Sequence, residues 1–162
     1  MIQDNLHQES PFERYISQKI VELTAQGRGW VMSPNDDGFD PNTALYLPDF
    51  LSYLGKTSPE KVEKMKANQG ANWETNLCKS LVKALEVDGT VKVLRDGFQM
   101  PGYSTITCSG HYPDDPRLPK QKVFYEGNIL RVMSQVHYQT AGSKTLDLVF
   151  FINGIPVATA DI

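Results

Sequence analysis

The stretch Leu146-Asp-Leu-Val-Phe-Phe-Ile-Asn153-Gly154-Ile-Pro-Val-Ala-Thr-Ala-Asp-Ile162 decides the fold. Two apolar segments flank Asn153-Gly154, a dipeptide that favours a two-residue turn between antiparallel strands because both turn positions need a positive φ. The stretch therefore predicts a β-hairpin with strands at 146–152 and 155–160. One carboxylate, Asp147, opens the first strand, and a second, Asp161, follows the end of the returning strand.

The pairing register of this hairpin decides where the two carboxylates point. In a regular two-residue hairpin Asp147 pairs with Ala160, so Asp161 points to the opposite face of the sheet. Both can bind one cation only if an odd-numbered loop or a β-bulge shifts the register by one residue. We expect such an irregularity between positions 150 and 159, where Pro156 cannot donate a hydrogen bond to the ladder.

The first half of the chain is predicted to be helical. Apolar residues recur at helical spacing in segments that begin near positions 10, 47, 57 and 71. Ser10 and Glu13 form a capping box at the start of the first helix, and Gly27 ends its pattern. We expect Gly55 to end the second helix and Thr57 to cap the third.

From position 89 onward the apolar pattern changes toward a period of two. We expect strands at 91–93, 103–107 and 129–138, with a proline-rich loop at 112–120 and one earlier short strand at 30–32. Helices followed by a strand-rich half predict an α+β domain whose sheet is covered by helices on at least one side.

The length and composition are ordinary for a soluble globular protein of one domain. The 162 residues carry 40% apolar and 22% charged side chains, with a net charge of −3. A basic footprint for DNA is absent overall, so binding DNA would require a local patch or other domains. No 18-residue apolar run, secretory signal or Cys-x-x-Cys pair is found, which predicts a cytoplasmic protein without a membrane span.

A set of residues spread over much of the chain points to one enzyme family. The strongest are Asn128, Arg131, Gln135, Lys144, Asp147 and the run Phe151-Ile-Asn-Gly-Ile-Pro-Val-Ala-Thr159, with Glu13, Leu94-Arg-Asp-Gly97 and Tyr125 in support. In these residues the chain resembles the N-terminal nuclease region of the R subunits of type I restriction enzymes. The resemblance implies a restriction-endonuclease-like mixed sheet flanked by helices, with a helical N-terminal half.

The resemblance also implies a PD-(D/E)xK catalytic motif, in which an acid is followed at a distance by a second acid, any residue and a lysine. Asp147 matches the first acid, and Asp161 matches the second, where the family more often has glutamate. Ile162 matches the variable residue, and the lysine would come next. Residues 1–162 are then expected to be a single nuclease domain, cut from a longer protein just before its lysine.

The implied activity is that of a type I site-specific deoxyribonuclease acting on foreign double-stranded DNA. Asp147, Asp161 and the main-chain carbonyl of Ile162 would hold Mg²⁺, which activates water and offsets charge on the phosphate. Without the lysine, we expect weak metal binding and poor cleavage. The resemblance further implies modification and specificity subunits as partners, and ATP use only by domains absent from this chain.

Other residues are candidates for supporting roles. Glu13 and Gln135 are candidate accessory groups, although a cap explains Glu13. Lys144 and Arg131 are candidate DNA contacts, although both could be solvated surface residues. Two alternatives stay open: a non-catalytic docking module for neighbouring motor domains or the methyltransferase core, and a related nuclease that serves repair or another defence system.

Overall fold

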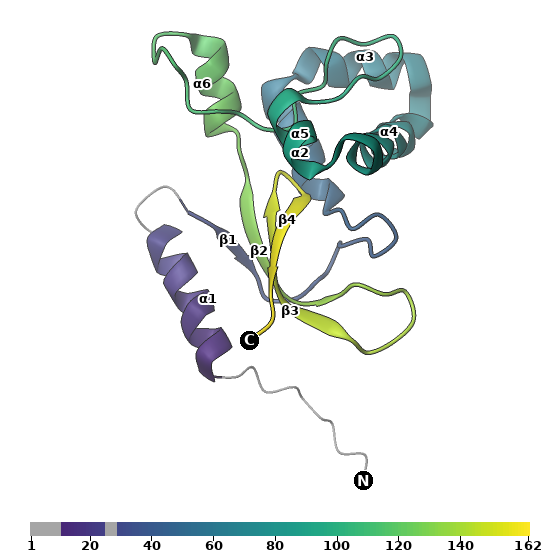
Figure 1. The fold of residues 1–162 in the computed structure, drawn as a ribbon. Helices are drawn as coiled ribbons and strands as arrows, with labels where there is room; N and C mark the ends of the chain where they lie inside the picture. Colours follow the sequence, from purple (N-terminus) through teal and green to yellow (C-terminus); the bar gives the residue numbers. More distant parts are fainter. Residues whose placement is uncertain (1–10, 25–28) are drawn as a thin grey trace.

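The chain folds into a four-stranded sheet with one helix beside it and a group of helices at one end (Figure 1). The computed structural model describes residues 11–24 and 29–162. Its strands are β1 (Val31–Ser33), β2 (Leu130–His137), β3 (Thr145–Ile152) and β4 (Ile155–Ala160). Its helices are α1 (Pro11–Thr24), α2 (Leu47–Thr57), α3 (Pro59–Gln69), the 3-10 turn η1 (Gly70–Asn72), α4 (Trp73–Asp88), α5 (Thr90–Asp96) and α6 (Pro119–Glu126).

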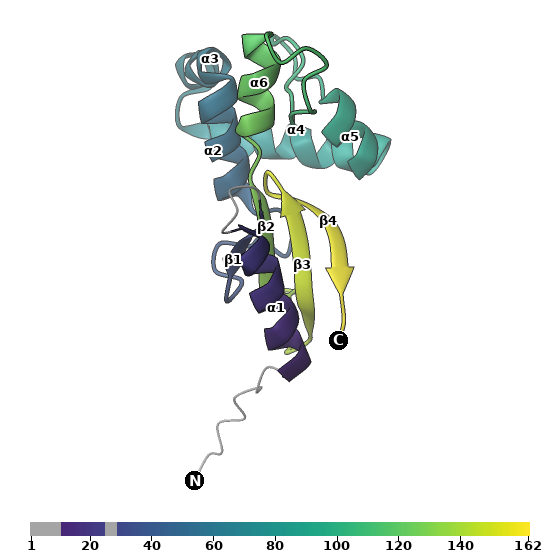
Figure 2. The same ribbon diagram turned by 90° about the vertical axis from the view of Figure 1, so that its left-hand side faces the viewer.

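The sheet is mixed, with strand order β1-β2-β3-β4. β1 pairs parallel to β2, whereas β2, β3 and β4 pair antiparallel. Figure 2 shows α1 running along the sheet while α2 to α6 gather beyond the β3–β4 turn. The α+β class is therefore confirmed, and a closer likeness to restriction endonucleases stays a prediction.

Two apolar clusters hold these parts together. The larger lies among the helices and includes the fully buried Tyr53, Leu77 and Cys108. The smaller lies on the sheet around Phe151, whose ring meets the rings of Phe39 and Tyr46 edge-on or tilted. Ile155 of β4 is buried in the helical cluster, so the start of that strand connects the sheet to the helices.

The helices and strands with the strongest local signals are confirmed. The first helix, the short strand near position 31 and the last three strands all form where the pattern predicts them. Asn153 and Gly154 have φ angles of 50° and 79°, as a tight hairpin turn requires. The capping role expected of Ser10 and the helix end expected at Gly27 lie outside the described residues.

The expected boundary at Gly55 is wrong. Helix α2 continues through Gly55 to Thr57, because a glycine inside a helix costs only about 1 kcal/mol and packing can offset it. The residue that precedes α3 is Ser58 rather than Thr57. The Thr57 hydroxyl instead donates a hydrogen bond to the carbonyl of Tyr53, one turn back in α2.

The strand expected at 91–93 is also wrong, because this segment forms α5. In a strand Val91 and Val93 would share a face, but here Val91 is 75% exposed while Val93 is fully buried. The segment 103–107 contributes only the isolated bridge between Phe98 and Ile106. Because these two expected strands do not form, the second half of the chain is less strand-rich than its pattern predicts. Helix α6 begins at Pro119, within the end of the expected loop.

Candidate active site

The β3–β4 hairpin contains the register irregularity that the sequence predicts. Ile152 pairs with Ile155 next to the turn, but Phe150 pairs with Ala158, so the register shifts by one residue at Val157. The extra residue follows Pro156, which cannot donate to the ladder. The shifted register runs on to Leu148 and Ala160.

This shift is the one that would set the two carboxylates on one side of the hairpin. Continuing the register by one residue sets Asp161 opposite Asp147, and residues opposite each other in an antiparallel pair point to the same face. The main-chain N–H of Ile162 donates to Asp147 Oδ2 at 2.6 Å. The peptide that links Asp161 to Ile162 therefore lies against the Asp147 carboxylate.

Gln135 lies next to Asp147 in an unusual conformation. Its φ is 52°, although it sits inside β2 and is not glycine. Its Nε2 lies 3.3 Å from Asp147 Oδ1, and its Oε1 accepts a hydrogen bond from Thr145 Oγ1 at 2.8 Å. A non-glycine residue in this region costs roughly 1–3 kcal/mol, and such positions cluster at functional sites.

Helix α1 adds a third side chain to this group. Glu13 is only 4% exposed, and its Oε1 lies 3.1 Å from the same Gln135 Nε2 that approaches Asp147. A cap alone would leave this carboxylate at the helix surface. Its burial against β2 instead makes Glu13 part of the group around Asp147.

Arg131 bonds to Asp49 and Ser33, which lie outside the group around Asp147, and so stabilises the fold. Its guanidinium makes a bidentate ion pair with the buried Asp49 of α2, at 2.7 and 3.0 Å, and a third hydrogen bond to Ser33. It also stacks over the ring of Tyr46. The hydrogen bonds to Asp49 raise the pKa of Arg131, although its partial burial acts in the opposite direction.

The DNA contacts expected of Arg131 and Lys144 stay predictions, and the structure favours them unequally. The donors of Arg131 are occupied by partners within the chain, so a DNA phosphate would have to displace them. Lys144 is exposed in the loop before β3, three residues before Asp147 in the sequence, and no partner occupies its ammonium in the described part of the chain.

The oxygen atoms around Asp147 suit a hard divalent cation. Magnesium is usually held by one or two carboxylates and keeps several waters. Residues 11–24 and 29–162 contain no group of three or more acidic, histidine or cysteine side chains placed to hold a metal. The described residues therefore provide no complete cage of side chains, and the set of Asp147, Asp161 and the Ile162 carbonyl stays a prediction.

A second polar network, at the other end of the hairpin, was not predicted from the sequence. Asn153 is fully buried; its Oδ1 accepts the N–H of Ile129, and its Nδ2 donates to the carbonyl of Cys108 and to Asn128 Oδ1. Asn128 in turn bonds both main-chain groups of Gly110. The Asn-Gly signal identifies the turn, but nothing local identifies these distant partners.

The turn also approaches the start of α2 closely. The carbonyl of Gly154 accepts the N–H of Tyr46 at 2.9 Å, and a Cβ at Gly154 would lie 2.1 Å from the Tyr46 carbonyl oxygen. Only glycine allows this approach at a φ of 79°. Asn153 and Gly154, which belong to the run that carries the family resemblance, therefore also stabilise the fold.

Comparison with known proteins gives one family. A family model described as the type I restriction enzyme R protein N terminus matches residues 11–160. No match was found among curated proteins or among solved structures. Within the part of the chain that the structure describes, none of the helices combines the length and apolarity needed to cross a membrane.

Proposed function

The chain belongs to the family of the type I restriction enzyme R protein N terminus, and from this premise we propose that it carries a DNA endonuclease site. The reaction would be metal-dependent hydrolysis of phosphodiester bonds in foreign double-stranded DNA. The proposal includes a PD-(D/E)xK-like arrangement, with Asp147 as its first acid and Asp161 as its second.

The observation that carries this proposal is the register shift at Val157. A regular hairpin would put Asp147 and Asp161 on opposite faces of the sheet, where they could not share a cation. The observed pairing is shifted by one residue up to Leu148 and Ala160, and the same register carried one residue further would put the two acids opposite each other on one face. The strand pairing therefore supports the geometric condition that the chemistry sets.

The chain's own residues would divide the work at this site. Asp147, Asp161 and the carbonyl of Ile162 would hold Mg²⁺, which supplies a Lewis acid that activates water and offsets charge on the phosphate. Gln135 would fix the orientation of the Asp147 carboxylate through its amide. Glu13 would hold that amide in place from α1, and it would keep the site negative enough to attract a cation.

The partners of such a site are part of the proposal. The duplex would be delivered by other domains and by modification and specificity subunits, because a net charge of −3 gives this chain little attraction for DNA. ATP would be used outside this chain. Lys144, which is exposed in the loop before β3, would contact a phosphate.

Metal binding gives the most direct test. We would titrate Mn²⁺ into the 162-residue chain and follow free Mn²⁺ by electron paramagnetic resonance, with wild type, Asp147→Asn and Asp114→Asn side by side. Asp114 is an exposed carboxylate in the loop before α6, so its variant removes the same charge elsewhere. We expect Asp147→Asn to weaken binding at least about tenfold, because ligand charge sets the affinity of such sites.

Two outcomes would contradict the proposal. Equal affinity in wild type and Asp147→Asn would show that any bound metal lies elsewhere. A wild type that binds no Mn²⁺ would favour the docking alternative. In an assembled restriction complex, Asp147→Asn should lower DNA cleavage at least about a hundredfold, the scale expected when charge stabilisation at a reacting phosphate is lost.

A further inference from the structure

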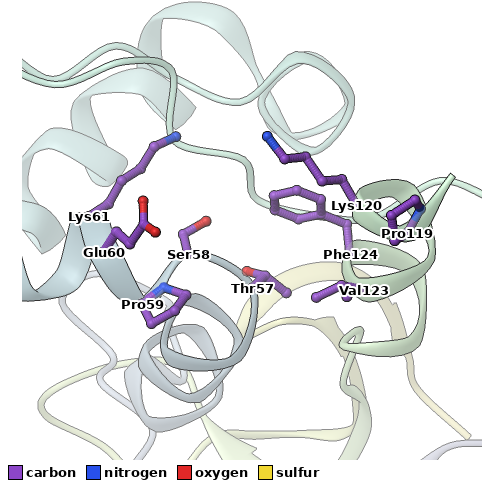
Figure 3. Close-up of a pocket in the computed structure, with 9 residues that line it drawn as sticks. All are labelled: Thr57, Ser58, Pro59, Glu60, Lys61, Pro119, Lys120, Val123 and Phe124. Atoms are coloured by element: carbon purple, nitrogen blue, oxygen red, sulfur yellow. The ribbon is translucent and has the colours of Figure 1, made fainter.

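A pocket of about 440 Å³ lies between the start of α3 and helix α6 (Figure 3). Figure 1 places these helices at the opposite end of the molecule from the chain's C-terminus, where Asp147 accepts its bond from Ile162. Its polar wall comes from Ser58, Glu60 and Lys61, and its other wall from Lys120, Val123 and Phe124. Nothing in the proposed endonuclease site uses it.

Ser58 is the feature that distinguishes this pocket from an ordinary surface groove. It precedes α3 in the capping position, but its side chain makes no capping hydrogen bond. The residue is only 8% exposed, and no partner for its hydroxyl is found in the described part of the chain. Figure 3 shows the hydroxyl pointing into the pocket. The hydroxyl opens into the pocket, where it can bond a water or a ligand oxygen.

The charges around Ser58 favour an anion. Glu60 and Lys61 are the second and third residues of α3, whose N–H groups lack a carbonyl partner within a helix. Lys61 Nζ donates to the carbonyl of Thr105 at 2.5 Å, which leaves two of its three donors for a ligand. Lys120, at the start of α6, reaches toward the same space from the other wall. The exposed Glu60 carboxylate opposes these groups.

The remaining wall is apolar. Val123 and the half-buried Phe124 ring face the space beside the lysines, with Pro59 and Pro119 at its edges. The volume falls in the range of small-molecule sites, roughly 300–1,000 Å³, and exceeds what inorganic phosphate alone would fill. The pocket therefore suits a ligand with one anionic end and one apolar or aromatic end.

We propose that this pocket binds a small organic phosphate of the mononucleotide class. Its phosphate would accept hydrogen bonds from the Ser58 hydroxyl and from the N–H groups at the start of α3. Lys61 and Lys120 would neutralise its charge from the two walls. Its base or sugar would lie on Val123 and Phe124.

The test uses three probes and isothermal titration calorimetry at low salt with EDTA present, so that metal binding at Asp147 has no influence. The probes are dAMP, inorganic phosphate and deoxyadenosine. We expect dAMP to bind most tightly, phosphate more weakly and deoxyadenosine most weakly. Deoxyadenosine binding as tightly as dAMP, or no binding of dAMP at millimolar concentration, would overturn the proposal.

Variants locate the binding. Lys120→Gln should weaken dAMP binding about tenfold, because one hydrogen bond to a charged group corresponds to about that factor. Lys122→Gln is the matched control: it removes the same charge from α6, but Lys122 pairs with Glu126 and does not line the pocket. Equal weakening by both variants would mean that only overall charge matters, and would overturn the proposal.

Two further variants separate binding from folding. Ser58→Ala should weaken dAMP binding severalfold with little change in thermal unfolding, because its hydroxyl makes no capping bond to lose. Glu60→Gln should strengthen dAMP binding, since it removes the one carboxylate that lines the pocket. A purely structural role for these residues would not produce this opposite pair of effects, and unchanged affinity in both would contradict the site.

Discussion

Replacing Asn153 with alanine should lower the free energy of unfolding by about 4 kcal/mol. The side chain is fully buried and bonds two main-chain groups from separate segments, the N–H of Ile129 at 2.7 Å and the carbonyl of Cys108 at 2.9 Å. Alanine leaves both groups unsatisfied, at about 1–3 kcal/mol each. It also takes over a φ of 50°, which costs a residue with a plain Cβ about 1 kcal/mol more.

The assay is equilibrium unfolding in urea, followed by circular dichroism, with Asn153→Gly as the matched control. Glycine removes the same hydrogen bonds but adopts the positive φ without strain, so it should be about 1 kcal/mol less destabilising than alanine. A loss of 4 kcal/mol should lower the melting temperature by about 12 °C in a chain of this length. A loss below about 1 kcal/mol in the alanine variant would refute the reasoning that this side chain holds the sheet to the helices.

Two more predictions concern ion pairs. Arg131→Met should cost about 3–5 kcal/mol in urea unfolding, because it leaves the buried Asp49 carboxylate unpaired, and adding Asp49→Leu should recover much of that loss; a single variant within about 1 kcal/mol of wild type would show that the pair is not needed. Burial raises the pKa of Asp36, but hydrogen bonds from the main chain and ring of His137 outweigh this and hold that pKa below its ordinary value. The stabilisation is therefore present above the unfolded pKa of about 3.9 and is lost as pH falls through the lower folded value. Stability measured from pH 6 to pH 2 should fall less steeply in Asp36→Asn than in wild type, and parallel curves would contradict this.

The fold was predictable where a single local signal was strong. The Asn153-Gly154 turn and the apolar runs on either side fix the hairpin with no help from distant residues. Helix α5 was not predictable in this way, because Val91 and Val93 are two residues apart. That spacing fits one face of a strand, but it also fits a short helix in which one valine is exposed and the other is buried. The glycines that precede and follow α5, at φ 82° and 73°, are the signal that could have indicated a separate short element.

The part of the candidate site that lies within one hairpin was predictable from the sequence, but its contacts with distant residues were not. One hairpin of about 16 residues contains Asp147, Asp161 and the required register shift. Within a hairpin, the sequence spacing determines to which face of the sheet each side chain points. The contact between Glu13 and Gln135 joins residues 122 positions apart, and no local pattern encodes it. Arg131 shows the same limit, since its place on a strand indicates a surface position, while its partner Asp49 comes from a distant helix.

The two ends of the β3–β4 hairpin have different tasks, and the bulge allows both. At the turn, a regular register is needed so that Asn153 and Gly154 can seat against the helices, where added atoms would clash. At the open end, the register must be shifted by one residue so that Asp161 can lie across from Asp147. A hairpin of one uniform register cannot satisfy both conditions, because a shift of one residue reverses every side chain beyond it. Deleting Ala160 should therefore keep the bulge and the turn but bring Asp161 opposite Leu148, on the other face from Asp147, so that Mn²⁺ affinity falls while the buried Asn153 network stays intact. Deleting Val157 is the matched control: it removes the bulge but leaves Ala158 to Asp161 with the same partners, so Mn²⁺ affinity should be kept.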